Sequence, residues 1–300
     1  MNTISELLVG YREMSKLTQQ ELVDQLSSYS EDFKNLNTVT ISRWETGTTS
    51  PGLGKKKQLL RFFADRGSLY DDSKCHKVVE NAYNNLYAPL SDVFTRNYQY
   101  LIGNFPEFEL DHSHVHSLRS FFDKRAHFEH IIDIETVTNV PNYYTLTPMQ
   151  LGSLCDQPSS YAIICERKKQ HLGHFVMFKI KNEVAQKVVR HQKSEYSITT
   201  SDLCGVNENG TYYVHALYGK NPKIAALLNV HAYLHLFKHM KTVDNVMIFS
   251  SRKDGVLLTK DYGIALIDKG RDETYGFDWH GLMSPVEDIL FSDTVVKLIF

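Results

Sequence analysis

The segment Leu17–Gly47 constrains the fold of this chain most, because it carries the signals of two short helices in tandem. Thr18 is a good N-cap residue, and Glu21, three positions later, completes a capping box. Asn37 can cap a second helix, and Gly47 can end it. The apolar residues with helical spacing are Leu22, Val23, Leu26, Val39, Ile41 and Trp44. The segment therefore predicts a helix-turn-helix, a structure that can enter the major groove of DNA.

From about Ile4 to Phe63 the sequence resembles the XRE family of Cro-like and phage-repressor-like proteins. The resemblance rests on Leu-Thr-Gln-Gln-Glu-Leu from Leu17 and on Thr-Ile-Ser-Arg-Trp-Glu-Thr-Gly from Thr40. It implies a five-helix domain that binds operator DNA as a dimer, with a buried ion pair between Arg12 and Glu45. The residues that it places against DNA are Gln19, on a phosphate, and Thr38, Val39, Ser42 and Arg43, on the bases.

The chain departs from the family between Leu26 and Thr38, where it is longer by about eight residues. This polar insert could lengthen the second helix or form a loop. Arg43 is the candidate for reading a guanine through two hydrogen bonds, and a plain phosphate contact is its alternative role. Basic residues that follow the motif could neutralise phosphates or form a solvated helix face. They are Lys55, Lys56 and Lys57.

Length and composition indicate an ordinary globular protein with more than one domain. A chain of 300 residues exceeds one helix-turn-helix domain, and its 42% hydrophobic and 23% charged residues are typical values. No apolar run approaches the ~20 residues that cross a bilayer, and the first residues do not resemble a secretory signal. The four cysteines are scattered, which favours a reducing compartment over disulfides or a zinc finger. We therefore expect a cytoplasmic protein that has no membrane partner.

The hydrophobic pattern predicts three segments: a DNA-binding domain at 1–67, a linker with a helical connecting or dimerisation segment at 68–130, and a second domain at 131–300. Helical spacing runs from His76 to about Arg125. In the second domain the expected strands are 161–165, 174–180, 212–217, 245–250 and 263–267, and the expected helices are 223–240 and 254–262. The predicted fold is multi-domain, with an all-α N-terminal domain and an α/β (α+β) C-terminal domain.

This order of elements, from about Asn142 to Gly270, resembles the GNAT fold of N-acetyltransferases. Local support comes from Ala225–Leu228 and Gly255–Gly263. An active member has a Gln/Arg-x-x-Gly-x-Gly/Ala loop whose N–H groups hold the cofactor pyrophosphate at a helix N-terminus. Here that stretch is Gly219–Ile224, in which Pro222 has no N–H and Ile224 places a branched side chain where the phosphates would approach.

The family's general-acid tyrosine falls on Thr259, although Tyr262 is close by. These departures predict a degenerate domain without a catalytic residue or cofactor, with acyl-CoA as the alternative ligand. The residues that could contact a ligand are Lys220, Lys223 and Tyr262. Histidines at four-residue steps on the long helix could share a metal, but no carboxylate or cysteine lies at a matching step, so we predict no metal site. They are His231, His235 and His239.

Together these patterns predict a dimeric, sequence-specific transcriptional regulator. Its partners would be operator double-stranded DNA, a second copy of the chain and a small-molecule effector, with the GNAT-like domain used for sensing or dimerisation. Two alternatives remain open. One is an active acyl-CoA-dependent N-acyltransferase fused to a DNA-binding domain. The other is an antitoxin or partner-binding protein with an exposed apolar face near Trp279 and Val295–Phe300.

Overall fold

The computed structural model describes residues 3–66, 114–138, 145–252, 255–257, 259, 262–293 and 295–296. The chain divides into two compact units, Met1–Leu86 with Leu290–Phe300, and Tyr87–Ile289. The predicted segments 1–67, 68–130 and 131–300 stay a prediction, and most of the helical pattern predicted for 76–125 lies outside the described residues. None of the helices in the described part of the chain is long and apolar enough to cross a membrane.

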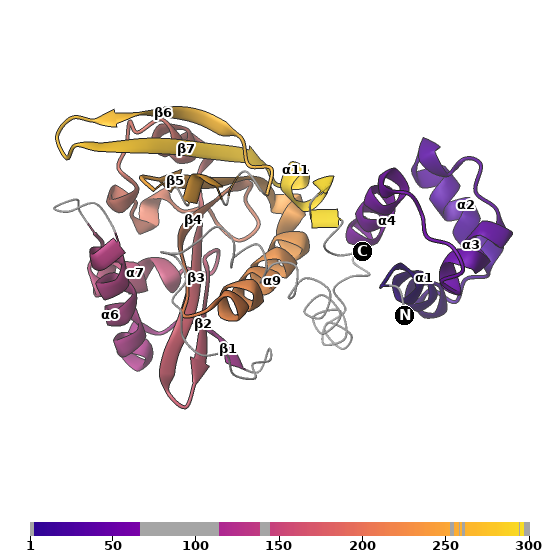
Figure 1. Ribbon diagram of the computed structural model, residues 1–300, viewed down its shortest axis with the longest axis horizontal. Helices are drawn as coiled ribbons and strands as arrows, with labels where there is room; N and C mark the ends of the chain where they lie inside the picture. Colours follow the sequence, from indigo (N-terminus) through magenta and orange to yellow (C-terminus); the bar gives the residue numbers. More distant parts are fainter. Residues whose placement is uncertain are drawn as a thin grey trace. The chain divides into compact units, whose positions relative to one another are not determined.

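Residues 3–66 form a small all-α bundle (Figure 1). Its elements are α1 (Thr3–Met14), α2 (Gln19–Tyr29), the 3-10 turn η1 (Glu31–Phe33), α3 (Thr38–Glu45) and α4 (Leu53–Asp65). The fully buried side chains of its core include Leu8, Leu22, Leu26, Phe33, Ile41, Leu59 and Phe62. The family resemblance implied five helices, whereas the described residues from Ile4 to Phe63 contain four α-helices and one 3-10 turn.

The predicted helix caps of this unit are confirmed. The Thr18 hydroxyl accepts the Glu21 N–H at 3.2 Å, and the Glu21 carboxylate accepts the Thr18 N–H at 2.7 Å. Asn37 accepts the Thr40 N–H at 2.9 Å. The insert both extends α2 to Tyr29 and adds η1, whose Phe33 is fully buried, so it contributes to the core. These contacts establish a helical unit but not a DNA-binding helix-turn-helix.

The second unit is built on a mixed sheet, which among the described residues has seven strands in the order β1-β2-β3-β4-β5-β7-β6. The strands are β1 (Val115–Ser117), β2 (Tyr161–Arg167), β3 (Gln170–Ile180), β4 (Gly210–Gly219), β5 (Val243–Ser250), β6 (Leu266–Asp272) and β7 (Phe277–Pro285). Neighbouring strands in this sheet are antiparallel, except that β4 and β5 are parallel. The parallel pair has a physical consequence for the site, because its two strands point their carboxyl ends in the same direction.

Helices cover both faces of this sheet. They are α6 (Phe121–Thr138), α7 (Pro148–Cys155), α8 (Asn182–Val189), α9 (Pro222–His239) and α11 (Val286–Leu290), with 3-10 turns η3 (Glu195–Ser197), η4 (Thr200–Asp202) and η5 (Met240–Thr242). Figure 1 shows α6 and α7 on one side of the sheet and α9 on the other. Phe128, Leu151 and Val188 bring α6, α7 and α8 into one core with β3 and β5. Apolar burial on both faces fits the nearly continuous hydrophobic run in β3.

The predicted strands 161–165, 174–180, 212–217 and 245–250 and the helix 223–240 are confirmed with small changes at their ends. The strand expected at 263–267 is wrong, because the chain turns there. Gly263 has a left-handed backbone conformation with φ 73°, and the Ile264 N–H donates to the Thr259 carbonyl. Strand β6 begins only at Leu266. The helix expected at 254–262 lies partly outside the described residues.

An exposed apolar face near Trp279 would favour the partner-binding alternative, and the described residues there do not form one. Trp279 lies on β7 and is 8% exposed, and Val295 and Val296 are buried in the first unit. The apolar residues of this region therefore serve the two cores rather than an exposed surface, and 297–300 lie outside the described residues.

Candidate functional site

The parallel strands β4 and β5 separate at their carboxyl ends. They are paired only as far as Val214 and Ile248. Beyond these residues β4 continues to Gly219 beside β3, and β5 continues to Ser250 beside β7. From His215 onward β4 therefore has no strand partner on its β5 side among the described residues, so its backbone there is open to an extended ligand.

A β-bulge lies at the same point of β4. Val176 of β3 pairs with Ala216, and the next residue, Met177, pairs with Val214. His215 is therefore opposite no residue of β3. A bulge redirects a side chain and is common beside active sites. The bulge thus coincides with the residue at which β4 and β5 part.

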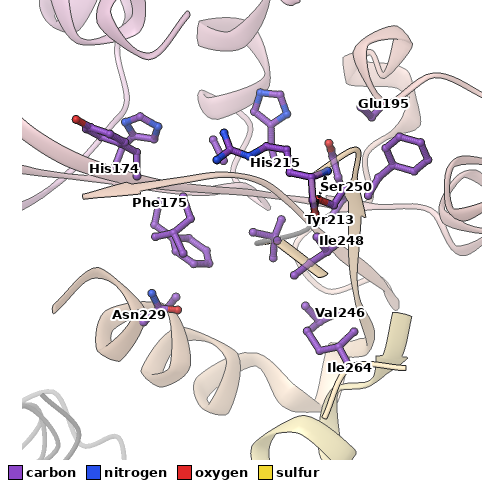
Figure 2. A pocket seen from close by; sticks show the side chains of 18 of the residues that line it. His174, Phe175, Glu195, Tyr213, His215, Asn229, Val246, Ile248, Ser250 and Ile264 are labelled. Atoms are coloured by element: carbon purple, nitrogen blue, oxygen red, sulfur yellow. Dashed lines mark hydrogen bonds between the residues drawn. The ribbon is translucent and has the colours of Figure 1, made fainter. Parts of the chain in front are cut away.

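A cavity of ≈ 200 Å³ fills the space between the separated strands. Most of its wall is hydrophobic or aromatic, from β4, β5 and α9, and it includes Phe175, Ala216, Leu236, Ile248, Phe249 and Ile264. Its polar side chains are few and include Glu135, His174, Glu195, His215, Asn229 and Ser250. Figure 2 shows His215 and Glu195 on one side of β4 and Asn229, Val246 and Ile264 on the other. An apolar cavity with a few converging polar groups is typical of a ligand site.

His215 and Glu135 form a buried pair in the wall of this cavity. Nε2 of His215 lies 3.0 Å from Oε1 of Glu135, and the two side chains are 1% and 10% exposed. Burial lowers the pKa of His215, but the charges of Glu135 and Glu195 outweigh burial, so its pKa is raised above the ordinary value. His215 is therefore a stronger base than a free imidazole.

The pair has unused hydrogen-bonding capacity. The 3.0 Å contact lies outside hydrogen-bond geometry, and both ring nitrogens of His215 and Oε2 of Glu135 are buried without a hydrogen-bond partner among the described residues. Buried polar atoms are nearly always hydrogen-bonded to protein, water or ligand. These atoms are therefore available to pair with water or with a polar group of a ligand.

The N-terminus of α9 is largely closed to phosphate. Asn221 caps it by accepting the Ile224 N–H at 2.9 Å, its carbonyl accepts the Ala225 N–H, and Pro222 has no N–H. The expectation for Ile224 is wrong: its side chain is fully buried toward Gly173 of β3 and does not block the helix end. This helix end is thus poorly suited to the pyrophosphate of coenzyme A, because the Ile224 and Ala225 N–H groups are already bonded to Asn221 and Pro222 has none.

Only one of the predicted ligand-contacting residues lines the cavity. Tyr262 does so, is 6% exposed, and lies with its ring 5.7 Å from that of Tyr233. Lys220 and Lys223 are not part of the cavity wall. Thr259, which the resemblance placed at the general-acid position, is fully buried and donates its hydroxyl to the Val256 carbonyl at 2.7 Å. It is therefore a structural residue.

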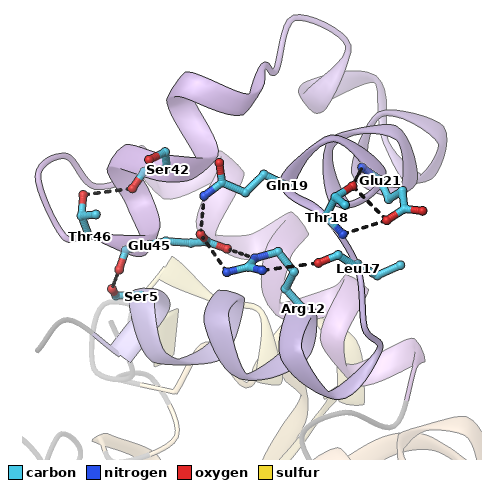
Figure 3. A network of polar contacts seen from close by, with 9 residues as sticks. All are labelled: Ser5, Arg12, Leu17, Thr18, Gln19, Glu21, Ser42, Glu45 and Thr46. Atoms are coloured by element: carbon cyan, nitrogen blue, oxygen red, sulfur yellow. Dashed lines mark hydrogen bonds and ion pairs between the residues drawn. The ribbon is translucent and has the colours of Figure 1, made fainter.

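The first unit contains a polar network around Glu45 (Figure 3). Arg12 Nε lies 2.7 Å from Glu45 Oε1, and Gln19 Nε2 donates to Glu45 Oε2 at 2.7 Å. The Ser5 hydroxyl donates to the Glu45 carbonyl. Gln19, expected on a phosphate, is thus turned toward the carboxylate that also holds Arg12.

The other residues that the resemblance placed against DNA are spread over α3 and α4. Val39 is 57% exposed, Arg43 is exposed, and Thr38 and Ser42 are half-buried. On α4 the Lys55 ammonium lies 5.9 Å from the Trp44 ring, Lys56 is half-buried, and Lys57 forms an ion pair with Asp293. Part of this basic run therefore packs within its own unit.

The histidines of α9 lie in different surroundings. His235 stacks on Tyr161 at 3.9 Å and shares a hydrogen bond with the Tyr212 hydroxyl at 2.7 Å. Burial lowers its pKa to about 2, which keeps it neutral. The described residues contain no group of three or more His, Cys, Asp or Glu placed to hold a metal ion.

Known structures that match the chain are acyltransferases. FeeM, an N-acyl amino acid synthase from uncultured soil microbes, has 10% identity over 62% of this chain and 97% of its own, with a TM-score of 0.42. The ribosomal-protein-S18-alanine N-acetyltransferase from Escherichia coli has 10% identity over 57% and 92%, with a TM-score of 0.37. A probable GNAT acetyltransferase from Chromobacterium violaceum has 12% identity over 62% and 94%, with a TM-score of 0.38. The C-terminal region resembles the GNAT acetyltransferase fold. No protein-family model and no curated protein sequence matches the chain.

These matches overturn the main functional prediction from sequence. The chain was expected to be a DNA-binding transcriptional regulator, but the three structures are N-acyl- or acetyltransferases, and none indicates DNA binding or transcription regulation. That prediction is wrong, and no DNA contact is assigned to α3 or α4. The alternative prediction, an N-acyltransferase, agrees better with them. At these low identities the likeness concerns the fold and does not extend to the chemistry of the cavity.

Proposed function

We propose that this protein is an N-acyltransferase that transfers an acyl group from a thioester to an amine in the cavity between β4 and β5. The observation that carries the proposal is the position of His215. This buried base, paired with Glu135, lies in a bulge at the point where the two parallel strands separate. There it is adjacent both to backbone that can hold an extended substrate and to an apolar cavity.

The open edge of β4 and the apolar wall suit an acyl thioester. Backbone groups of His215–Tyr218 can pair with amides of an extended donor, as a strand pairs with a sheet edge. Phe175, Ala216 and Leu236 can pack against the acyl chain. Because the α9 N-terminus does not suit a pyrophosphate, we assign binding residues to the thioester and acyl parts of the donor and none to its nucleotide.

The acidic side of the cavity suits the amine. A primary amine is mostly an ammonium ion at neutral pH, and Glu135 and Glu195 are both buried in the wall. Their charges attract the cation into a region where it would otherwise be poorly solvated. The ammonium ion must lose one proton before it can attack and a second proton once the C–N bond forms, and His215 is the neighbouring base for the second.

The reaction then proceeds by addition and elimination at the thioester carbonyl. The neutral amine nitrogen attacks the carbonyl carbon, the C–N bond forms, and His215 takes a proton from the nitrogen. The C–S bond breaks, and the leaving thiolate receives a proton. We assign that donation to Tyr262, the buried hydroxyl in the wall of the cavity, and the proton that His215 has taken balances the one that Tyr262 gives up, so that both groups are restored. The products are an amide and a thiol.

The proposal is tested with the full chain, a series of S-acyl-pantetheine and acyl-CoA thioesters of increasing chain length, and a panel of primary amines. Amide formation is followed by mass spectrometry and thiol release by a colour reagent. We expect His215→Gln to lower kcat by about 10²–10⁴-fold, the usual contribution of a positioned base. His116→Gln is the matched control, because His116 is an exposed histidine on β1.

Both variants are compared with the parent protein by thermal melting, so that loss of activity is separated from loss of folding. Absence of amide with every thioester and amine pair would overturn the proposal. Equal activity of His215→Gln and the parent would leave an acyltransferase but remove His215 as its base.

A further inference from the structure

A chain of side chains, linked by two hydrogen bonds and one ion-pair contact, leads from the cavity wall to the surface of the second unit. Nδ1 of His174 lies 3.0 Å from Nε2 of His171, and Nδ1 of His171 lies 3.0 Å from Nδ1 of His127. Nε2 of His127 lies 2.8 Å from Oε2 of Glu166. His174 lines the cavity, whereas the Glu166 side chain is 20% exposed. We call these four residues the histidine chain.

A second β-bulge makes this arrangement feasible. Glu166 of β2 pairs with His171, and the preceding residue, Cys165, pairs with Gly173, so Leu172 is opposite no residue. Residues three apart on a regular strand point to opposite faces of the sheet. The extra residue shifts this alternation by one, which brings His171 and His174 to the same side of β3. Their contact is therefore a product of the fold rather than of the spacing alone.

The contacts allow one assignment of protons in which every imidazole is neutral. His127 donates from Nε2 to the Glu166 carboxylate and accepts at Nδ1. His171 donates from Nδ1 to His127 and accepts at Nε2, and His174 donates from Nδ1 to His171. This leaves Nε2 of His174 as an acceptor, and no other hydrogen bond of His174 is found among the described residues.

The surroundings favour neutral imidazoles at rest. Burial, with the neighbouring His130 and His215, lowers the pKa of His174 to about 3. Burial and the charges of His174, His130, His127 and Lys220 strongly lower the pKa of His171. Burial also lowers the pKa of His130, which faces the ring of His171 at 4.9 Å. A resting charge on His171 or His174 would make both of its nitrogens donors and break the chain, so neutrality preserves it.

A metal ion does not explain the cluster. His171 contacts His127 through Nδ1 and His174 through Nε2, on opposite edges of its ring. One ion cannot bind both edges of a single imidazole. The part of the chain that the structure describes also contains no group of three or more His, Cys, Asp or Glu placed to hold a metal ion.

We propose that Glu166, His127, His171 and His174 form a proton relay that carries the proton released by the amine substrate from the cavity to the surface. The relay rests on the proposed N-acyltransferase activity. When an ammonium ion and a thioester form an amide and a thiol, one proton is left over in each turnover. The cavity is buried, so this proton needs a path to solvent.

Each step of the relay conserves protons. His174 accepts at Nε2 the proton that the ammonium ion loses before attack, and passes its own Nδ1 proton to Nε2 of His171. His171 passes its Nδ1 proton to Nδ1 of His127, and His127 passes its Nε2 proton to the Glu166 carboxylate. Glu166 releases the proton to water, and each of the three imidazoles exchanges one proton with water to regain its first tautomer before the next turnover. No bond other than N–H and O–H changes.

The first experiment measures the tautomers and needs no activity. Long-range ¹H–¹⁵N spectra of the full chain with ¹⁵N-labelled histidine distinguish Nδ1–H, Nε2–H and imidazolium forms. We expect His127 as Nε2–H and both His171 and His174 as Nδ1–H, with His171 and His174 remaining neutral at about pH 6, where a free histidine is mostly charged. An imidazolium or an Nε2–H form at His171 would overturn the relay.

The second experiment measures turnover. Glu166→Gln keeps an oxygen that accepts the His127 hydrogen bond but cannot take up a proton. We expect kcat to fall about 10²-fold in dilute buffer, with KM little changed, and to recover as imidazole buffer is added. Glu129→Gln is the matched control, because Glu129 is an exposed carboxylate of α6 that pairs with Arg125 and does not belong to the histidine chain. We expect it to match the parent protein.

The two experiments separate the relay from the enzyme activity. Unchanged turnover of Glu166→Gln in dilute buffer would overturn the relay while the acyltransferase stands. If the parent protein forms no amide, the proposed function fails, and the relay fails with it as a catalytic device even where the tautomers agree. Loss of turnover that buffer does not restore would also overturn the relay, because it would indicate a structural role for Glu166.

Discussion

Replacing Glu135 with glutamine tests the pair on which the proposed chemistry depends. The His215 and Glu135 side chains are only 1% and 10% exposed, so the relevant comparison is a buried ion pair rather than a surface pair. Removing one partner of a buried pair costs about 3–5 kcal/mol, whereas an exposed pair contributes about 0–1 kcal/mol. In a unit of about 200 residues this corresponds to a fall in melting temperature of about 6–20 °C.

The penalty has a predictable dependence on pH. The pKa of folded His215 is raised above its unfolded value, so the pair's contribution is fully present below the ordinary histidine pKa of about 6.5. It is lost as pH rises through the raised pKa, because His215 is then neutral with or without Glu135. Glu135→Gln should therefore lower the melting temperature strongly at acid pH and much less at alkaline pH.

The assay is thermal unfolding of the full chain, followed by circular dichroism, at a mildly acid and a mildly alkaline pH. Glu129→Gln is the control, because its pair with Arg125 has side chains 46% and 69% exposed and should change little at either pH. The double variant with His215→Gln measures the coupling between the two residues directly. An equal loss of stability by Glu135→Gln at both pH values would show that charge pairing with His215 is not its cause, and the reasoning would be refuted.

Three further predictions follow from the same contacts. Glu45→Ala should destabilise the first unit by about 1.5–3 kcal/mol, because Arg12 and Gln19 both lose a charged hydrogen-bond partner, and an unchanged melting curve would contradict this. Ala216→Phe should fill the cavity between β4 and β5 and abolish acyl transfer while the protein stays folded, so full activity would remove this cavity as the site. Removing the nucleotide from the donor should change kcat/KM by less than about tenfold, since each factor of ten corresponds to about 1.4 kcal/mol. If kcat/KM with S-acyl-pantetheine is lower than with acyl-CoA by more than about tenfold, the protein binds the nucleotide after all.

Much of the second unit could be predicted from hydrophobic pattern. Strands β2 to β5 are short apolar runs between polar turns, and α9 is a long helix with Asn221 at its cap. Strand β7 was missed although Phe277 and Trp279 alternate with polar residues, which is a readable strand signal. Strand β1 has only three residues and is held by pairing with β2, so its sequence alone carries too little signal.

The candidate site was harder to predict than the fold. His215 and His174 each interrupt an apolar strand, and that interruption was the one local signal available. The partner of His215 is Glu135 of α6, 80 positions earlier, and the partner of His174 is His171, which a bulge brings to the same face of β3. Such contacts depend on tertiary packing, which periodicity does not report. The residues singled out from the family loop, Lys220 and Lys223, lie outside the cavity.

The two bulges give the clearest reason why sequence pattern did not locate the site. A period of two fixes which face a strand residue takes, and one extra residue reverses that assignment for everything beyond it. In β4 the extra residue is His215 itself, and in β3 it is Leu172, beside His171 and His174. Each bulge interrupts a ladder that regular pairing would have completed, and each does so where histidines face the cavity or one another. Because these two bulges lie beside titratable side chains and set which way those side chains face, we infer that the sheet gives up regular pairing here to orient them.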